Sequence, residues 1–319
     1  MGAYLQSNTR ATKVFTLAFV LTVSVILAST LYNYAMAKWT AQSAYQMHRT
    51  LVQHTADAPN RYRVLVPVLV ESFSRLMPSV VQPQLRFLGG YFIYYQGSVA
   101  FSLMLLFIYL RQWYACPQAL VGILVVAMSM LVAFGDGYFQ PWSLLEIGLF
   151  TAGLLAIYKS QRMLLAGIIG LATLNRETGV FLVITYLLIN LKRETRFLAR
   201  SHLIWTGIYS AIWGSIFIGV RLWLGATPQL SLMQILQMNF NLGALLMTGV
   251  NGVLFLGAYW ILVWKGYKVS HPFIRTTWRI VPVYLIAVLI FGLWPEVRLL
   301  TLLYPILIST GLEVWDMTA

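Results

Sequence analysis

The sequence predicts an all-α polytopic membrane protein, a single bundle of about ten transmembrane helices with an interfacial helix in its first external loop. Of its 319 residues, 59% are hydrophobic and only 10% are charged, and the mean hydropathy is +0.74. A soluble domain could not cover that much apolar surface with polar residues. Because apolar runs recur along the whole chain, we expect residues 1–319 to form one transmembrane domain.

The first apolar run, 14–35, follows Arg10 and Lys13 and is long enough to cross a bilayer. It lacks a convincing small-residue cleavage site, so we expect an uncleaved anchor. Both chain termini are then expected in the cytoplasm of a multi-pass protein of the inner or plasma membrane. Further apolar runs predict the remaining spans, at 87–110, 117–134, 142–158, 163–175, 179–191, 203–224, 242–264, 279–294 and 297–314.

The longest polar stretch, 38–86, forms the first external loop in this topology. Its middle, 64–77, reads VLVPVLVESFSRLM and groups its polar residues on part of one face. That pattern predicts a short helix lying on the membrane surface.

Arginine is unusually frequent in the same loop. Elsewhere the predicted external loops carry few Lys and Arg, as the positive-inside bias requires, but 38–86 carries Arg49, Arg61, Arg63, Arg75 and Arg86. An excess of arginine on the side that normally avoids it indicates recognition of an anion.

Charged residues also interrupt the apolar sequence at Asn175-Arg176-Glu177-Thr178. An ionisable group at membrane depth costs several kcal/mol and usually pairs or faces a wet cavity. The flanking runs are too short for perpendicular spans, so we expect the two helices to meet in a recess lined by protein.

Two interpretations of the arginines remain open. An arginine binds two phosphate oxygens at once and keeps its charge when partly desolvated, so Arg61, Arg63, Arg176 and Arg298 could hold a pyrophosphate or a lipid-linked phosphate. Alternatively, Arg176 pairs with Glu177 or Glu296, and Arg298 with Asp136, and these ion pairs only join helices.

Carboxylates are the candidate general bases, since a sugar hydroxyl is a poor nucleophile until a base accepts its proton. The candidates are Asp57, Asp136 and Glu177, with Glu296 as a further acid beside Arg298. Asp136 precedes a polar and aromatic stretch that includes Gln140 and suits a carbohydrate. Glu146, one turn inside its span, is a possible buried partner for an arginine.

Several classes of function lack support. One cysteine, Cys116, cannot build a disulfide framework or a thiolate cluster. His48 and His54 with Asp57 make a weak metal pattern, so we expect no metal or other cofactor. Nucleotide-binding and serine-hydrolase motifs are absent, and the net charge of +13 is better explained by orientation and anionic lipid than by nucleic acid.

Three segments resemble those of a known group of membrane enzymes: Arg61-Tyr62-Arg63-Val64-Leu65-Val66-Pro67, Asn175-Arg176-Glu177-Thr178 and Glu296-Val297-Arg298. The pattern looks like that of bacterial polytopic proteins implicated in cell-surface glycopolymer formation, which resemble the GT-C superfamily of glycosyltransferases. The resemblance implies transfer of a sugar from a polyprenyl-phosphate donor on the outer face, with a large first external loop that contains membrane-parallel helices and an acid.

The sequence departs from that superfamily in one respect. The acid usually comes soon after the first span, but here Asn33, Lys38, Gln42 and Gln46 occupy that region and the first acid is Asp57. The base is then Asp57, Asp136 or Glu177. The resemblance implies three partners, namely the polyprenyl-phosphate sugar, membrane lipids and a glycan or other acceptor. A transporter or flippase for a lipid-linked or anionic solute, and a non-catalytic membrane subunit, are the alternatives.

Overall fold

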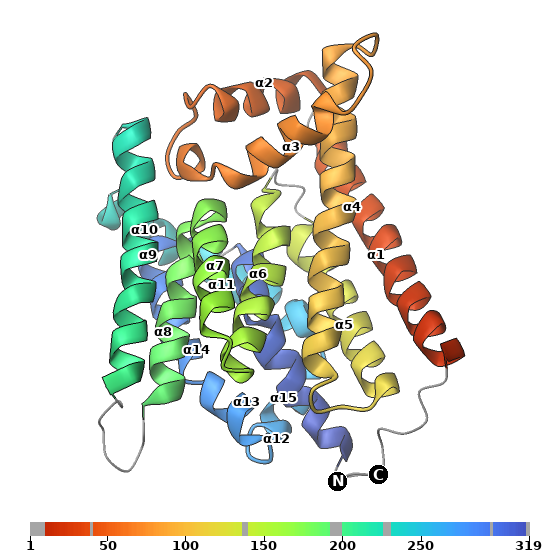
Figure 1. Cartoon of the computed structure of the whole chain (residues 1–319), viewed down its shortest axis with the longest axis vertical. Coiled ribbons are helices and arrows are strands. Elements are labelled where there is room, and N and C mark those ends of the chain that lie inside the picture. The colour runs from red at the N-terminus through yellow and green to blue at the C-terminus, as the bar shows by residue number, and fades with distance from the viewer. Residues whose placement is uncertain are drawn as a thin grey trace.

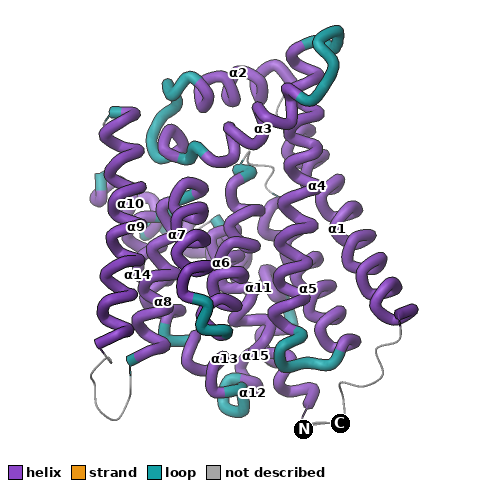
Figure 2. Tube along the Cα trace, viewed as in Figure 1, coloured by secondary structure: helices purple, strands orange, loops and turns teal. Residues whose placement is uncertain are grey.

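Helices account for all the regular structure in the part of the chain that the computed structural model describes, residues 10–38, 41–135, 140–191, 200–225, 231–293 and 296–316. The α-helices are α1 (Arg10–Lys38), α2 (Ala41–Val52), α3 (Leu65–Arg75), α4 (Pro83–Leu110), α5 (Cys116–Phe134), α6 (Trp142–Tyr158), α7 (Arg162–Asn175), α8 (Val180–Asn190), α9 (Arg200–Leu224), α10 (Leu232–Asn239), α11 (Leu242–Leu256), α12 (Tyr259–Gly266), α13 (Pro272–Thr277), α14 (Ile280–Phe291) and α15 (Tyr304–Asp316). Short 3-10 helices are η1 (Asn60–Tyr62), η2 (Glu177–Gly179) and η3 (Val297–Leu303). The prediction of an all-α chain is confirmed for these residues, and Figure 2 shows no strand among them.

Six helical segments of the described residues are long and apolar enough to cross a membrane. They are Ala11–Lys38, Pro83–Leu110, Cys116–Phe134, Arg200–Leu224, Pro272–Phe291 and Val297–Val314. A seventh is obtained if α10 and α11, bent by 67°, count as one broken span. The segments Trp142–Tyr158, Arg162–Asn175 and Glu177–Asn190 are apolar but shorter, so a multi-pass membrane protein is supported while the number ten remains a prediction.

The helices α2 and α3 lie across one end of the bundle, over the ends of the long helices (Figure 1). The predicted interfacial helix at 64–77 corresponds to α3, whereas α2 was not predicted. Val68 and Leu76, in and just after α3, are 60% and 79% exposed. An apolar helix face left open beside a transmembrane bundle suits the surface of a bilayer.

A buried histidine joins α2 to α3 and α4. His48 is 2% exposed, and its Nδ1 lies 3.2 Å from the Tyr91 hydroxyl while Nε2 lies 3.0 Å from Oε1 of Glu71. Burial lowers the pKa of His48, although Glu71 opposes that effect. A neutral imidazole that accepts from Tyr91 and donates to Glu71 satisfies both contacts, so we assign this tautomer and treat the contact with Glu71 as a hydrogen bond.

The break between α7 and α8 lies at the same end of the bundle. Arg176 adopts an extended backbone, with φ −164° and ψ 148°, which ends α7 and turns the chain into η2. Gly179 then passes so close to α7 that an added Cβ would lie 2.8 Å from Oγ1 and 2.9 Å from N of Thr173. Glycine is therefore needed for the close approach that returns the chain into α8.

Candidate functional site

The site is built where α6, α7, η2 and η1 meet beneath α3. At the end of α7, Asn175 is buried and its Nδ2 donates to the backbone oxygen of Trp142 at 3.0 Å. This bond fixes the end of α7 against the beginning of α6. It places the next two residues, Arg176 and Glu177, beside the polar residues of α6 and η1.

An inner ion pair joins α6 to this turn. Nη1 of Arg176 lies 2.8 Å from Oε2 of Glu146, and both side chains are 8% exposed. The other oxygen of Glu146 accepts a hydrogen bond from the Thr178 hydroxyl, and Ser143 Oγ lies 3.4 Å from the guanidinium. Since both carboxylate oxygens have partners and both side chains are buried, this pair can hold two helices together, and Glu146 offers a substrate little access.

An outer ion pair lies next to it. Nη2 of Arg63 lies 3.4 Å from Oε1 of Glu177, and Nη1 of the same arginine donates to Asn60 Oδ1 at 3.1 Å. Arg63 is 4% exposed whereas Glu177 is 33% exposed. Glu177 is thus the accessible carboxylate of the two that face this turn.

An aromatic ring packs on the face of the Arg63 guanidinium, whose edge is bound by Asn60 and Glu177. Its Cζ lies 4.7 Å from the ring centroid of the buried Trp142, within the range of a cation–π contact. Burial lowers the pKa of Arg63 to about 10, against the opposing effect of Glu177. Arg63 therefore remains a cation at neutral pH, and its Nε has no hydrogen-bond partner among the described residues.

The helix α9 supplies the third side of the site. Arg221 lies over the rings of Tyr62 and Phe217, at 4.5 and 3.5 Å from their centroids, and interacts electrostatically with Glu177. Trp213 donates its indole N–H to the backbone oxygen of Glu177 at 3.2 Å. Glu177 thus pairs with Arg63, from the loop before α3, and also interacts with the charge of Arg221, from α9.

Arg61 fixes η1 to the end of α9. Its guanidinium donates to the backbone oxygen of Leu224, and the adjacent Tyr62 hydroxyl donates to that of Gly225 at 3.1 Å. The Arg61 Nε has no hydrogen-bond partner in the described part of the chain. Of the predicted substrate-binding residues, Arg61, Arg63 and Arg176 are therefore brought to one end of the bundle, next to the candidate base Glu177.

The other predicted residues have different positions. Gln140 accepts weakly from the Trp142 indole N–H at 3.4 Å and so borders the cluster. Glu296 and Arg298 pair with each other at 2.7 Å at the start of η3, which packs against α6. Asp57 is exposed, and its side chain makes no hydrogen bond or ion pair with a described residue. Asp136 lies outside the residues that the structure describes.

The expected structural pairings are corrected in part. Arg176 pairs with Glu146 rather than with Glu177 or Glu296, because the end of α7 lies directly against α6. The buried side chain of Glu146 is thereby confirmed as the partner of an arginine. For Arg298, the expected partner Asp136 lies outside the described residues, and the pairing seen is with Glu296.

A small cavity adjoins the inner pair between α6, α7 and α8. Glu146, Asn175 and Thr178 line its polar side, and its volume is about 10 Å³. That is room for about one water molecule, and the buried Oδ1 of Asn175 has no hydrogen-bond partner in the described structure. A water there would satisfy Asn175, but a sugar would not fit.

Some members of the site escaped the sequence analysis. Asn60, Trp213 and Arg221 belong to it without having been predicted, whereas Trp142 lies in the aromatic stretch that follows Asp136. Arg221 carried the best signal, since it is a charge within an apolar span. No group of three or more His, Cys, Asp or Glu among the described residues could hold a metal ion, and His48 is instead bonded to Tyr91 and Glu71.

Comparisons with models of protein families, with curated proteins and with solved structures found no match to this chain.

Proposed function

We propose that this chain is a GT-C-like membrane glycosyltransferase that moves a sugar from a polyprenyl-phosphate donor to a glycan or other acceptor on the extracytoplasmic face. One observation carries the proposal. Glu177, a one-third exposed carboxylate, pairs with Arg63 and interacts electrostatically with Arg221, at the end of the bundle that α2 and α3 cover. An accessible acid beside cations that can take a phosphate is what such a transfer requires.

The chemistry assigned to these residues is a single displacement. The acceptor hydroxyl oxygen forms a bond to the anomeric carbon while the bond from that carbon to the phosphate oxygen breaks. Glu177 accepts the hydroxyl proton, and the leaving phosphate carries away the bonding electron pair. Arg63 and Arg221 would stabilise the negative charge that develops on the phosphate.

The free donors of Arg63 support its role toward an anion. Its Nε–H is buried without a described partner, and its contact with Glu177, at 3.4 Å, is long for a charge-assisted hydrogen bond. A phosphate oxygen could accept from this guanidinium without breaking the bond to Asn60. The cation–π contact with Trp142 would keep the group in place while its partner changes.

The membrane supplies the route for the donor. A polyprenyl chain resides in the bilayer, so its phosphate arrives at the level where α3 and the helix ends meet. The exposed apolar residues Val68, in α3, and Leu76, just after it, suit contact with the bilayer beside the site.

The test is transfer by the full chain in proteoliposomes that contain a panel of polyprenyl-phosphate hexoses together with glycan acceptors, measured as release of free polyprenyl phosphate. We expect Glu177→Gln and Arg63→Gln to reduce release at least 100-fold, because general-base and charge-stabilising groups each contribute about that much or more. Arg75→Gln is the matched control, since Arg75 lies at the same end of the bundle but is 81% exposed. Wild-type rates in both site variants would overturn the proposal.

Asp57 gives the assay a second comparison. It is the other described candidate base, and its side chain has no described partner. We expect Asp57→Asn to retain transfer. If Asp57→Asn abolished release while Glu177→Gln did not, the base would be reassigned to the loop before η1.

A non-catalytic subunit is the second candidate, and the inner pair favours it. Arg176 and Glu146 are buried and pair with each other, and both oxygens of Glu146 accept hydrogen bonds, as expected of ion pairs that only join helices. A purified wild-type chain that released no polyprenyl phosphate from any donor of the panel would support this reading.

A further inference from the structure

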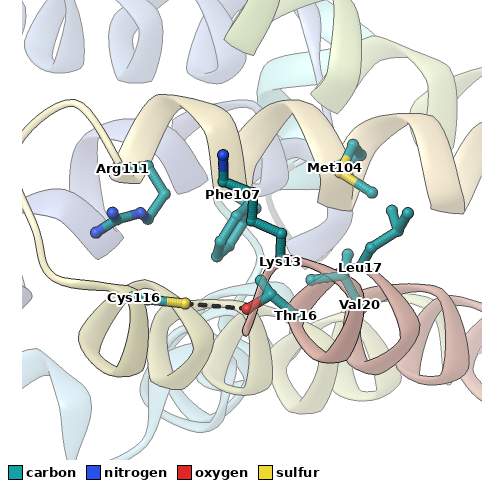
Figure 3. Close-up of a pocket in the computed structure, with 8 residues that line it drawn as sticks. All are labelled: Lys13, Thr16, Leu17, Val20, Met104, Phe107, Arg111 and Cys116. Carbon is teal, nitrogen blue, oxygen red and sulfur yellow. Dashed lines mark hydrogen bonds between the residues drawn. The ribbon is translucent and has the colours of Figure 1, made fainter. Parts of the chain in front are cut away.

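A second pocket lies far from the proposed site, at the opposite end of the bundle. It is formed between the beginning of α1, the end of α4 and the beginning of α5 (Figure 3). Its volume is about 200 Å³, more than ten times the roughly 10–15 Å³ that one water molecule needs in the same measure. Lys13 and Leu17 in its wall are exposed, so the pocket opens to the exterior along α1.

The lining is polar at one end and apolar at the other. Along α1, Lys13 is followed at helical spacing by Leu17 and Val20, and along the antiparallel α4, Arg111 is preceded by Phe107 and Met104. Figure 3 shows the same gradient, with Arg111 toward one side and Met104, Leu17 and Val20 toward the other.

The polar end has two cations and no acid among the lining residues. Neither Lys13 nor Arg111 forms an ion pair within the described part of the chain, and the guanidinium of Arg111 makes one hydrogen bond there, from Nη1 to the backbone oxygen of Tyr114. The helix α5 also begins here, and the positive end of its dipole adds to the field of the two side chains. Two unpaired cations and a helix N-terminus together favour an anionic group.

A hydrogen bond fixes the floor of the pocket. The Thr16 hydroxyl donates to the backbone oxygen of Thr12 at 2.8 Å, so the 3.2 Å contact between Thr16 Oγ1 and Cys116 Sγ has the thiol as its donor. This contact, drawn in Figure 3, holds α1 against α5. The beginning of α1, which carries Lys13, is thereby fixed against α5, and Arg111 lies in the turn that joins α4 to α5.

From these features we propose that the pocket binds an anionic phospholipid, with the phosphate between Lys13 and Arg111 and an acyl chain along Leu17, Val20 and Met104. The lining matches this occupant because a phospholipid has its charge and its apolar chain in the same order. A soluble anion would use the cations but leave the apolar half of the pocket without a role.

The test is native mass spectrometry of the full chain, extracted from membranes of equal parts phosphatidylglycerol and phosphatidylcholine. We expect the wild type to retain one phosphatidylglycerol in preference to phosphatidylcholine. Each cation near the membrane surface contributes about a fivefold preference for anionic lipid, so Lys13→Gln with Arg111→Gln should weaken retention about 30-fold. The matched control is Lys265→Gln with Lys268→Gln, which removes the same charge from two exposed lysines next to α12, at the same end of the bundle.

Two further arms make the outcome decisive. The exchange Lys13→Arg with Arg111→Lys keeps both charges and should keep the lipid, which separates loss of charge from loss of folding. Equal retention in the charge-removing and control variants would overturn the proposal. So would complete displacement of phosphatidylglycerol by inorganic phosphate, because the site would then recognise a soluble anion.

Labelling of the single cysteine tests whether the lipid lies in this pocket. Cys116 lines the pocket and is the one thiol of the chain. Its labelling by a water-soluble maleimide should be slower in nanodiscs that contain phosphatidylglycerol than in pure phosphatidylcholine, and equally fast in both for the variant without the two cations. If retained phosphatidylglycerol left the labelling rate of wild-type Cys116 unchanged, the lipid would lie elsewhere and the assignment would fail.

Discussion

Replacing Glu146 by Gln tests whether the inner ion pair holds the bundle together. The substitution keeps the shape of the side chain but removes its charge, and it leaves the guanidinium of Arg176, 8% exposed, without a counter-ion. Glu146 also accepts from Thr178 through its second oxygen, and an amide can accept at only one of these two positions. Loss of one partner of a buried pair typically costs about 3–5 kcal/mol.

We therefore expect Glu146→Gln to lower the free energy of unfolding by about 3 kcal/mol, measured by equilibrium unfolding in mixed detergent micelles. Arg176→Met should cost a similar amount. The double variant Glu146→Gln with Arg176→Met should lie within about 1 kcal/mol of the wild type, because no charge is then left buried alone. The two single costs would thus fail to add.

Additive costs, or single costs below about 1 kcal/mol, would refute this reasoning. Either result would mean that Arg176 finds other partners when Glu146 is changed. Thr178→Val is a useful companion, since it removes only the hydroxyl that donates to Glu146. We expect a cost of about 1–2 kcal/mol, as for other hydrogen bonds to charged groups.

Three other predictions concern single residues. Because burial lowers the pKa of His48 below 6.5, the unfolded chain takes up its proton at a higher pH than the folded one. The contribution of His48 to the free energy of unfolding should be complete above about pH 6.5 and should fall as the pH drops further, by up to about 1.4 kcal/mol per pH unit. The variant His48→Gln should lack this slope when unfolding is measured as a function of pH. Gly179→Ala should cost about 1–3 kcal/mol in the same measurement, since its Cβ would meet Thr173. Arg63→Lys keeps the charge but not the planar fork and should weaken donor binding about tenfold in a lipid-competition assay, whereas an unchanged affinity would show that the fork is not used.

Much of the fold was predictable because the apolar runs are long and distinct. The predicted spans at 87–110 and 117–134 differ from α4 and α5 by only a few residues. The run at 242–264 was predicted as one span, but the chain breaks at Gly257, whose φ of 53° belongs to the left-handed region that glycine tolerates. Hydropathy averages over such a break, so α11 and α12 were merged.

Which charged residues belong to the site could largely be predicted from the sequence, but which residue each of them pairs with could not. Arg63, Arg176 and Glu177 were singled out because charge among apolar residues is costly and therefore has a partner or a use. Which partner each one takes depends on how the helices pack, and the end of α7 lies against α6, so Arg176 reaches Glu146. Arg221 joins the cluster only because α9 passes behind η1, a contact between segments far apart in the sequence.

The two ion pairs lie at the same turn but differ in exposure, so we assign the inner pair to stability and the outer pair to the chemistry. Glu146 is 8% exposed and saturated with partners, whereas Glu177 is 33% exposed and 3.4 Å from its arginine. Arg63 is buried, but its contact with Glu177 is long and the carboxylate is partly exposed, so loss of this pair should cost less than loss of the inner pair. Glu177→Gln should therefore lose transfer and lose less stability than Glu146→Gln. If Glu177→Gln proved the less stable of the two, the outer pair would be the structural one, and the reason for assigning Glu177 to the chemistry would be gone.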